Sequence, residues 1–157
     1  MSEGVGRSIL SAPVALFDFR AKSVRADDGQ LIGGIRSEDH EIVCRDLDDT
    51  IVWIVENAGP FQVKTRIFDA DRQEIGTLAI NRLAAGDEPF ATLVQLRRAE
   101  LEIRDDDGEV LARLHNESRF WSFHQKVRIE VEPFVHAAER LAVLATVCVF
   151  EAAATLD

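Results

Sequence analysis

One long apolar segment near the C-terminal end constrains the fold of this 157-residue chain more than any other feature. Residues 134–156 contain no Gly or Pro, so we predict a helix about 30–35 Å long at a rise of about 1.5 Å per residue. Between Leu141 and Phe150 it would be apolar nearly all round, which is typical of a buried or a membrane helix. A membrane span needs about 18 or more uninterrupted apolar residues. Arg140 and Glu151 bound a shorter run here, so we expect a buried helix and no stable membrane insertion.

Four acidic turn sequences divide the chain before this helix. Two of them contain Asp-Gly, a strong hairpin signal because Gly adopts a positive φ at no steric cost. The other two use Asp, which tolerates the left-handed region and accepts hydrogen bonds from nearby backbone. After two turns the returning strand reaches a Gly, at Gly33 and Gly76, whereas a third has Ala112 instead. The turns are predicted at residues 26–29, 46–49, 69–72 and 105–108.

The segments between the turns have the patterns of β-strands. Residues 61–67 and 127–131 alternate apolar and polar side chains, which is the period of a half-buried strand. Residues 51–55 are continuously apolar, so we expect that strand to be covered on both faces. Residues 84–89 are predicted to form a loop. We therefore predict a mainly β protein, an antiparallel meander with one C-terminal α-helix, comprising a loose leader at 1–13 and a single domain at 14–157.

Composition restricts the classes of partner and compartment. The formal net charge is -10 and the isoelectric point is near 4.8, so the protein should repel nucleic acid and anionic lipid at long range.

Cys44 and Cys148 lie in apolar segments, and we expect two buried thiols, which suit a reducing compartment. The start of the chain has no basic region before an apolar stretch, so no signal peptide is predicted. We expect a cytoplasmic protein that does not bind nucleic acid.

Acidic hairpin corners followed by one apolar helix resemble the tubby-like barrel superfamily, and most closely its LURP-one-related and phospholipid scramblase-like branch. The resemblance implies a closed, twelve-stranded barrel around a central hydrophobic helix, and because this chain is short we expect fewer or shorter strands. Some relatives bind phosphoinositides through a basic face, and the scramblase branch is linked to calcium and to a membrane-inserted segment. This chain has no comparable basic cluster. The resemblance covers roughly residues 61–156 and rests on residues 69–76, 101–112, 120–123 and 127–131 and on the terminal helix.

No catalytic, cofactor or metal site is predicted. The turn at 105–108 is not an EF-hand loop, because with Gly108 at the sixth position Ile103 and Leu114 would be the first and twelfth ligands. The 4 histidines are far apart in sequence, and no Cys-x-x-Cys or His-Glu-x-x-His spacing occurs. Ser118 and Ser122 lie near histidines, but nothing resembles Gly-x-Ser-x-Gly. We therefore expect that the protein is not an enzyme.

Two groups of residues are candidates for ligand contact. The main concentration of basic residues would contact an anion or a lipid headgroup, although glutamates alternate with it. An aromatic cluster before the last strand would line a pocket, although such clusters more often form core. The basic group is Arg97, Arg98 and Arg104, and the aromatic group is Phe120, Trp121 and Phe123.

These observations favour a non-enzymatic, tubby-like binding or regulatory module whose ligand is lipid-like or a protein. The alternative is an open β-sheet with a helix on one face, which assembles with itself or with a partner. A small hydrolase-type enzyme is the third interpretation. The first two differ in whether the sheet closes around the helix.

Overall fold

The computed structural model describes residues 8–56, 64–79, 81–97, 99–117 and 126–156, and within the helix it describes the side chains of residues 139–148. The described chain forms twelve β-strands followed by one α-helix. The strands are β1 (Val14–Asp18), β2 (Ser23–Ala26), β3 (Leu31–Glu38), β4 (Glu41–Asp46), β5 (Ile51–Glu56), β6 (Lys64–Phe68), β7 (Glu74–Ala79), β8 (Arg82–Ala85), β9 (Glu88–Arg97), β10 (Glu100–Asp105), β11 (Val110–Asn116) and β12 (Lys126–Val131). The helix is α1 (Ala137–Leu156).

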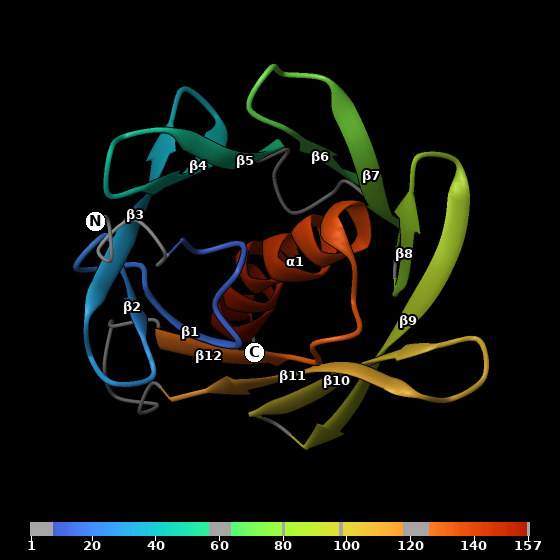
Figure 1. The fold of residues 1–157 in the computed structure, drawn as a ribbon. Helices are drawn as coiled ribbons and strands as arrows, with labels where there is room; N and C mark the ends of the chain where they lie inside the picture. The colour runs from blue at the N-terminus through green and yellow to red at the C-terminus, as the bar shows by residue number, and fades with distance from the viewer. Residues whose placement is uncertain (1–7, 57–63, 80, 98, 118–125, 157) are drawn as a thin grey trace.

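The strands form a closed antiparallel barrel (Figure 1). Each strand pairs with its neighbours in sequence, and β1 closes the barrel by pairing with β12, with Phe17 opposite Val127. Closure rules out the open-sheet alternative. The strand number is not reduced, contrary to one part of our expectation. Strand lengths range from 4 residues in β2 and β8 to 10 residues in β9.

The helix lies inside the barrel, as predicted (Figure 1). Residues Ala142–Cys148 are all buried, and Leu144 is completely inaccessible to solvent. The helix contacts β5, β7, β8, β11 and β12, so the wall surrounds it on several sides. It begins at Ala137, three residues later than residue 134, because Val135 instead donates a backbone hydrogen bond to Glu132 in a preceding turn.

Alternation along the strands directs apolar side chains toward this helix. Val127, Ile129 and Val131 of β12 are buried, and the residues between them are not, which confirms the predicted half-buried strand. β5 differs because four successive residues, 52–55, are buried. Ile54 lies outside the main core cluster yet is fully buried, so β5 is covered on both faces as predicted. Residues 61–63 of the other predicted alternating strand lie outside the described residues, and β6 begins at Lys64.

All four predicted acidic turns share one backbone hydrogen-bond pattern. In each, the first residue accepts from the N–H of the fourth and donates to the carbonyl of the fifth. The fourth residue has a positive φ in every case, which is the geometry of a type I turn followed by a bulge. The residue at that position is Gly in two turns and Asp49 in a third. In the turn at 69–72 it is Arg72, with φ 63°, and not the Asp that we expected. Asp69 and Asp105 accept additional backbone N–H bonds within their own turns.

The described part of the expected leader is packed against the barrel. Ile9 is fully buried, and its N–H donates to Asp46 Oδ1 at 3.0 Å. Ala12 is also buried, and the carbonyls of Leu10 and Ala12 accept hydrogen bonds from Arg140. The loose leader was therefore predicted too long at its C-terminal end. Ile9 and Ala12 join the core cluster, and together with the Arg140 hydrogen bonds they hold the segment against the barrel.

The predicted loop at 84–89 is wrong. Residues up to Ala85 belong to β8, and β9 starts at Glu88, so only residues 86 and 87 connect them. Gly86 makes this short turn with φ 61°. Pro89 is tolerated in β9 beside a register shift between Leu83 and Ala84 of the partner strand, where the ladder is irregular.

Candidate functional site

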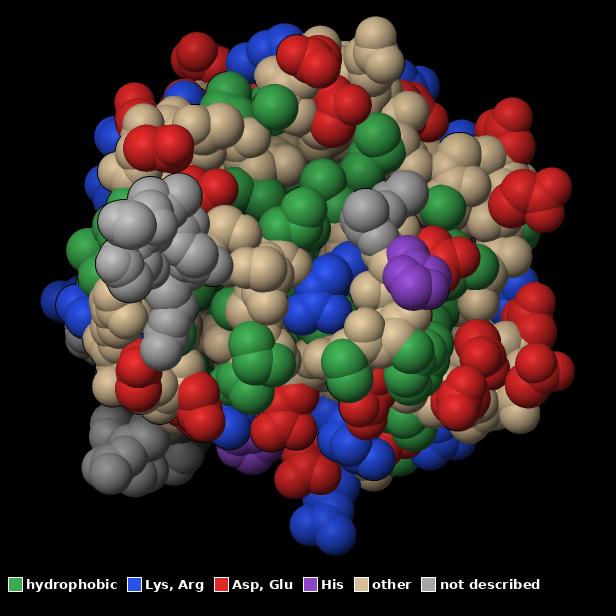
Figure 2. All heavy atoms as spheres, in the orientation of Figure 1, with side chains coloured by type: hydrophobic (Ala, Val, Ile, Leu, Met, Phe, Trp, Pro, Cys, Tyr) green, Lys and Arg blue, Asp and Glu red, His purple; other side chains and the backbone are tan. Residues whose placement is uncertain are grey.

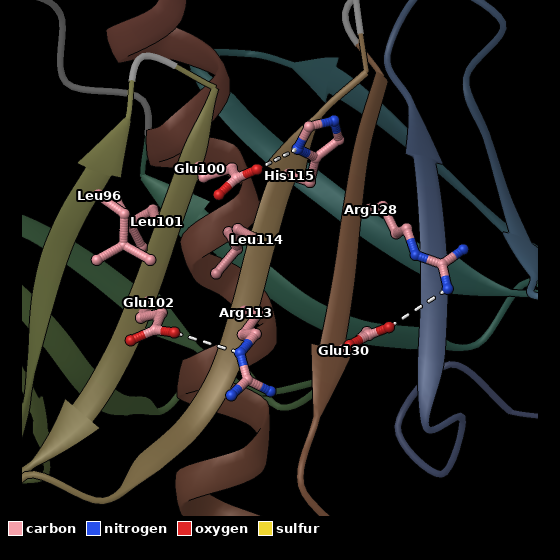
Figure 3. Close-up of a pocket in the computed structure, with 9 residues that line it drawn as sticks. All are labelled: Leu96, Glu100, Leu101, Glu102, Arg113, Leu114, His115, Arg128 and Glu130. Carbon is pink, nitrogen blue, oxygen red and sulfur yellow. Dashed lines mark hydrogen bonds and ion pairs between the residues drawn. The ribbon is translucent and has the colours of Figure 1, made fainter.

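A groove of about 330 Å³ lies on the outer face of the barrel, across β9 to β12 (Figure 3). Successive strand residues point to opposite faces, and Ile103 and Leu114 are buried in the core cluster. Glu102 and Arg113 therefore lie on the outer face, with α1 behind the wall. We call this feature the outer groove. Its lining residues are Leu96, Glu100, Leu101, Glu102, Arg113, Leu114, His115, Arg128 and Glu130.

Glu102 is the most enclosed charge of the outer groove. Its side chain is only 11% exposed, and it lies between two arginines. Arg104 Nη2 donates to Oε1 at 2.6 Å, and Arg113 Nε donates to Oε2 at 3.2 Å. The hydrogen bond from Arg104 is the main reason that the pKa of Glu102 is lowered, and Arg113 adds to it. The carboxylate is therefore ionised at neutral pH and is not a proton donor.

The other ionisable side chains of the outer groove also lie beside groups that can pair with them. His115 Nδ1 lies 3.8 Å from Glu100 Oε1. Arg128 donates to Asp27 Oδ1 at 2.8 Å and to Glu130 Oε2 at 3.3 Å. The contact with Asp27 is the main cause that raises the pKa of Arg128. The result is a surface with charges of both signs, and exposed Leu96 (46%) supplies apolar area beside it.

The structure places the two described residues of the predicted basic group, Arg97 and Arg104, apart from each other. Arg97 is opposite Glu100 at one end of β10, whereas Arg104 is near the other end, opposite Thr92. Arg104 is four residue steps along the strand from Glu100, which is about 13 Å at about 3.3 Å per residue. Arg104 is also held by Glu102. Arg98 lies outside the described residues, and so do all three predicted pocket aromatics, Phe120, Trp121 and Phe123.

Two large aromatic residues that sequence reasoning did not single out fill the interior instead. Trp53 and Phe17 are fully buried, with ring centroids 5.6 Å apart. Cys44 lies opposite Trp53 in the β4–β5 ladder, and burial raises its pKa well above the usual value. Both cysteines are buried free thiols, as predicted. The position of Trp53 within the apolar run at 51–55 was the available signal, since a fully covered strand must contribute to the core.

Within the described residues, no three His, Cys, Asp or Glu side chains are placed to hold a metal ion. In the acidic turns, the carboxylates of Asp69 and Asp105 accept hydrogen bonds from the backbone N–H groups of Gln73 and Glu109. In the part of the chain that the structure describes, no helix has the length and apolarity needed to cross a membrane.

The ion pairs of Glu102 predict a specific acid sensitivity. Because the folded-state pKa lies below the ordinary value of 4.5, the pairs stabilise the fold above that pH and stop doing so as the pH falls through the folded pKa. We expect Glu102→Gln to lower the melting temperature at neutral pH and to have a smaller effect in strong acid. Glu88→Gln, on an exposed residue at the start of β9, is the control and should change little. An equal effect of Glu102→Gln at every pH would contradict the assignment.

Comparisons with known proteins agree with the architecture. No family model matches the sequence, and no curated protein matches it. A solved structure of a protein from Arabidopsis thaliana is similar, with a TM-score of 0.64 and 13% sequence identity. The match covers 93% of this chain and 94% of that chain. Identity this low shows the fold alone. The closed barrel of twelve strands around one helix is compatible with a tubby-like barrel.

Proposed function

We propose that this protein is a non-enzymatic binding module of the tubby-like barrel type, in the LURP-one-related and scramblase-like branch, and that it acts in the cytoplasm. The barrel around a buried helix supports the fold part of this proposal. The acidic hairpin corners at 69–72 and 105–108, on which the sequence resemblance rests, have the same turn geometry. The proposed ligand-binding surface is the outer groove.

The observation that supports an external site is the filled interior. Small barrels either fill the inside with side chains or enclose a ligand there. Here the helix occupies the inside, and Ala142, Val143 and Leu144 have no solvent exposure. A ligand therefore binds outside the wall, where the outer groove offers about 330 Å³ between β9 and β12.

The pairing of charges indicates which ligand class fits the outer groove. Arg113 and Arg128 already interact with carboxylates, so an anionic headgroup would have to displace those partners. A protein segment with charges of both signs can exchange with the existing pairs, and an apolar side chain of that segment can pack on Leu96. We therefore favour a protein ligand over a lipid-like one.

The side chains that line the outer groove argue against a hydrolase. A nucleophile needs a base within hydrogen-bond distance, oriented by a third group. His115 is the histidine of the outer groove, and its Nδ1 lies 3.8 Å from Glu100 Oε1. No serine, threonine or cysteine is among the described residues that line the groove. We propose that this surface binds without chemistry.

Peptide selection with a matched pair of leucine variants tests the proposal. Random peptides selected on the wild-type protein should shift backbone amide resonances of β9 to β12. Their affinity should fall about tenfold or more in Leu96→Asp, because an apolar contact becomes a buried charge. Leu47→Asp, at an exposed leucine of the β4–β5 turn, is the control and should leave affinity unchanged. Peptides that bind Leu96→Asp as tightly as wild type would place the site elsewhere.

The electrostatics also predict that the domain does not attach to anionic membranes. Each Lys or Arg near such a surface contributes only about 1 kcal/mol, and the net charge of -10 opposes attachment. Sedimentation with phosphatidylserine vesicles at physiological salt should leave the protein in the supernatant, as it should with neutral vesicles. Strong sedimentation that is lost in Arg97→Glu plus Arg98→Glu would overturn this prediction and place a lipid site at the end of β9.

A further inference from the structure

A second pocket lies at the end of the barrel where α1 begins, away from the outer groove. Its volume is about 530 Å³. Figure 2 shows this end facing the viewer, with a basic side chain near its middle, hydrophobic side chains around it and acidic ones nearer the rim. We call it the end pocket. The lining residues used below are Ser8, Leu10, Ser11, Pro133, Val135 and Arg140.

Arg140 is the charged group of the end pocket, and its described partners are all neutral. Nε donates to the Leu10 carbonyl at 2.6 Å, Nη2 to the Ala12 carbonyl at 2.8 Å and Nη1 to the Glu132 carbonyl at 3.3 Å. Among the described residues, no carboxylate lies within ion-pairing distance of this guanidinium. In this respect Arg140 differs from Arg113 and Arg128 of the outer groove, which both pair with acidic residues.

The guanidinium has donors to spare. An arginine side chain has five N–H groups, and the three carbonyls account for three of them. α1 begins at the same end of the barrel, so its first backbone N–H groups lie there too. Arg140 N–H donates to the His136 carbonyl, whereas the first N–H groups of a helix have no carbonyl acceptor within the helix. A partly buried positive charge with spare donors and no counter-ion favours an anion.

The side chains that line the end pocket indicate which class of anion it can bind. Leu10, Pro133 and Val135 are apolar, and the hydroxyl groups of Ser8 and Ser11 are hydrogen-bonded to each other. Such walls cannot replace the hydration of a phosphate dianion, whereas a carboxylate needs only the paired donors of one guanidinium. We propose that the end pocket binds a monocarboxylate attached to an apolar group, with the carboxylate on Arg140 and the apolar group against Leu10, Pro133 and Val135.

Four small probes test this assignment on the full chain. Hexanoate should give a saturable change in the Nε–Hε resonance of Arg140. Hexan-1-ol tests the tail without the charge, acetate tests the charge without the tail, and inorganic phosphate tests a hydrated anion. Each of the three should bind about tenfold or more weakly than hexanoate, since each lacks one of the two contacts or must lose more hydration.

A carboxylate introduced into the end pocket by substitution should pair with Arg140 and compete with hexanoate. Ser11 is exposed and lines the end pocket, so Ser11→Asp should weaken hexanoate binding about tenfold or more. Ser11→Asn introduces a side chain with the shape of aspartate but without its charge, so this variant should bind hexanoate as tightly as the wild-type protein. Both substitutions leave the contacts of Arg140 with the backbone in place, so folding is retained.

Three outcomes would overturn the proposal. They are no saturable change at Arg140 with hexanoate, phosphate binding as tight as hexanoate, and full hexanoate binding by Ser11→Asp. The Leu96→Asp variant of the outer groove should bind hexanoate normally, because the two sites share no lining residue. Failure of this proposal is thus distinguishable from failure of the proposed peptide site.

Discussion

Replacement of Leu144 by aspartate is expected to leave no folded protein. Leu144 lies in the middle of α1 and is fully buried inside the closed barrel. Burial of a leucine side chain contributes about 1.5–3 kcal/mol, and an unpaired carboxylate in its place adds a penalty of several kcal/mol. The net stability of a domain is about 5–15 kcal/mol. The combined loss is therefore comparable to the whole free energy of unfolding.

Circular dichroism and thermal melting would measure this effect. Leu144→Asp should show no cooperative transition, or should be recovered only as aggregate. Leu144→Met is the matched control, because a volume-conserving apolar change costs less than about 1.5 kcal/mol and should retain a cooperative melt. If Leu144→Asp were soluble with the wild-type melting temperature, the helix would not be part of the core.

The helix and the hairpin corners could be predicted from sequence because their signals are local. The apolar run at 141–150 has no polar face to turn toward water, so it had to be enclosed. The four acidic corners indicate turns by their own residue types, and the structure gives all four the same hydrogen bonds. Arg72 is the exception, since nothing in its residue type favours a positive φ. There the hairpin on both sides determines the backbone.

Features that depend on distant parts of the chain could not be predicted. Closure of the barrel depends on β1 meeting β12, more than 100 residues later, and the resemblance rather than any local pattern indicated it. The burial of Ile9 depends on its packing against Gly33 of β3, more than 20 residues later, where the missing side chain leaves room for Ile9 Cδ1. The outer groove combines residues from four strands, and the basic residues that looked clustered in sequence are separated by the register of β9 with β10.

The recurring glycine of the hairpins has a steric reason that sequence alone left open. A Cβ built on Gly33 would lie 2.2 Å from the Arg45 carbonyl oxygen and 2.5 Å from Ile9 Cδ1. A Cβ on Gly76 would lie 2.5 Å from the Ala84 carbonyl oxygen. Such distances are far inside van der Waals contact, and a carbonyl in a strand ladder cannot move without loss of hydrogen bonds. Close approach of backbone, not a positive φ, therefore requires glycine at these two positions.

Gly33→Ala is expected to be strongly destabilising. Because the obstructing atom is backbone and Ile9 closes the other side, we expect a loss of about 3 kcal/mol, at the upper end of the usual cost of overpacking. In a domain of this size that corresponds to a fall of about 6–12 °C in melting temperature. Gly34→Ala on the same strand is the matched control, since its Cβ would meet only the Lys22 carbonyl oxygen, at 3.1 Å. Equal melting temperatures for the two variants would contradict the close approach of the Arg45 carbonyl oxygen to Gly33, because that backbone contact alone should separate the two substitutions.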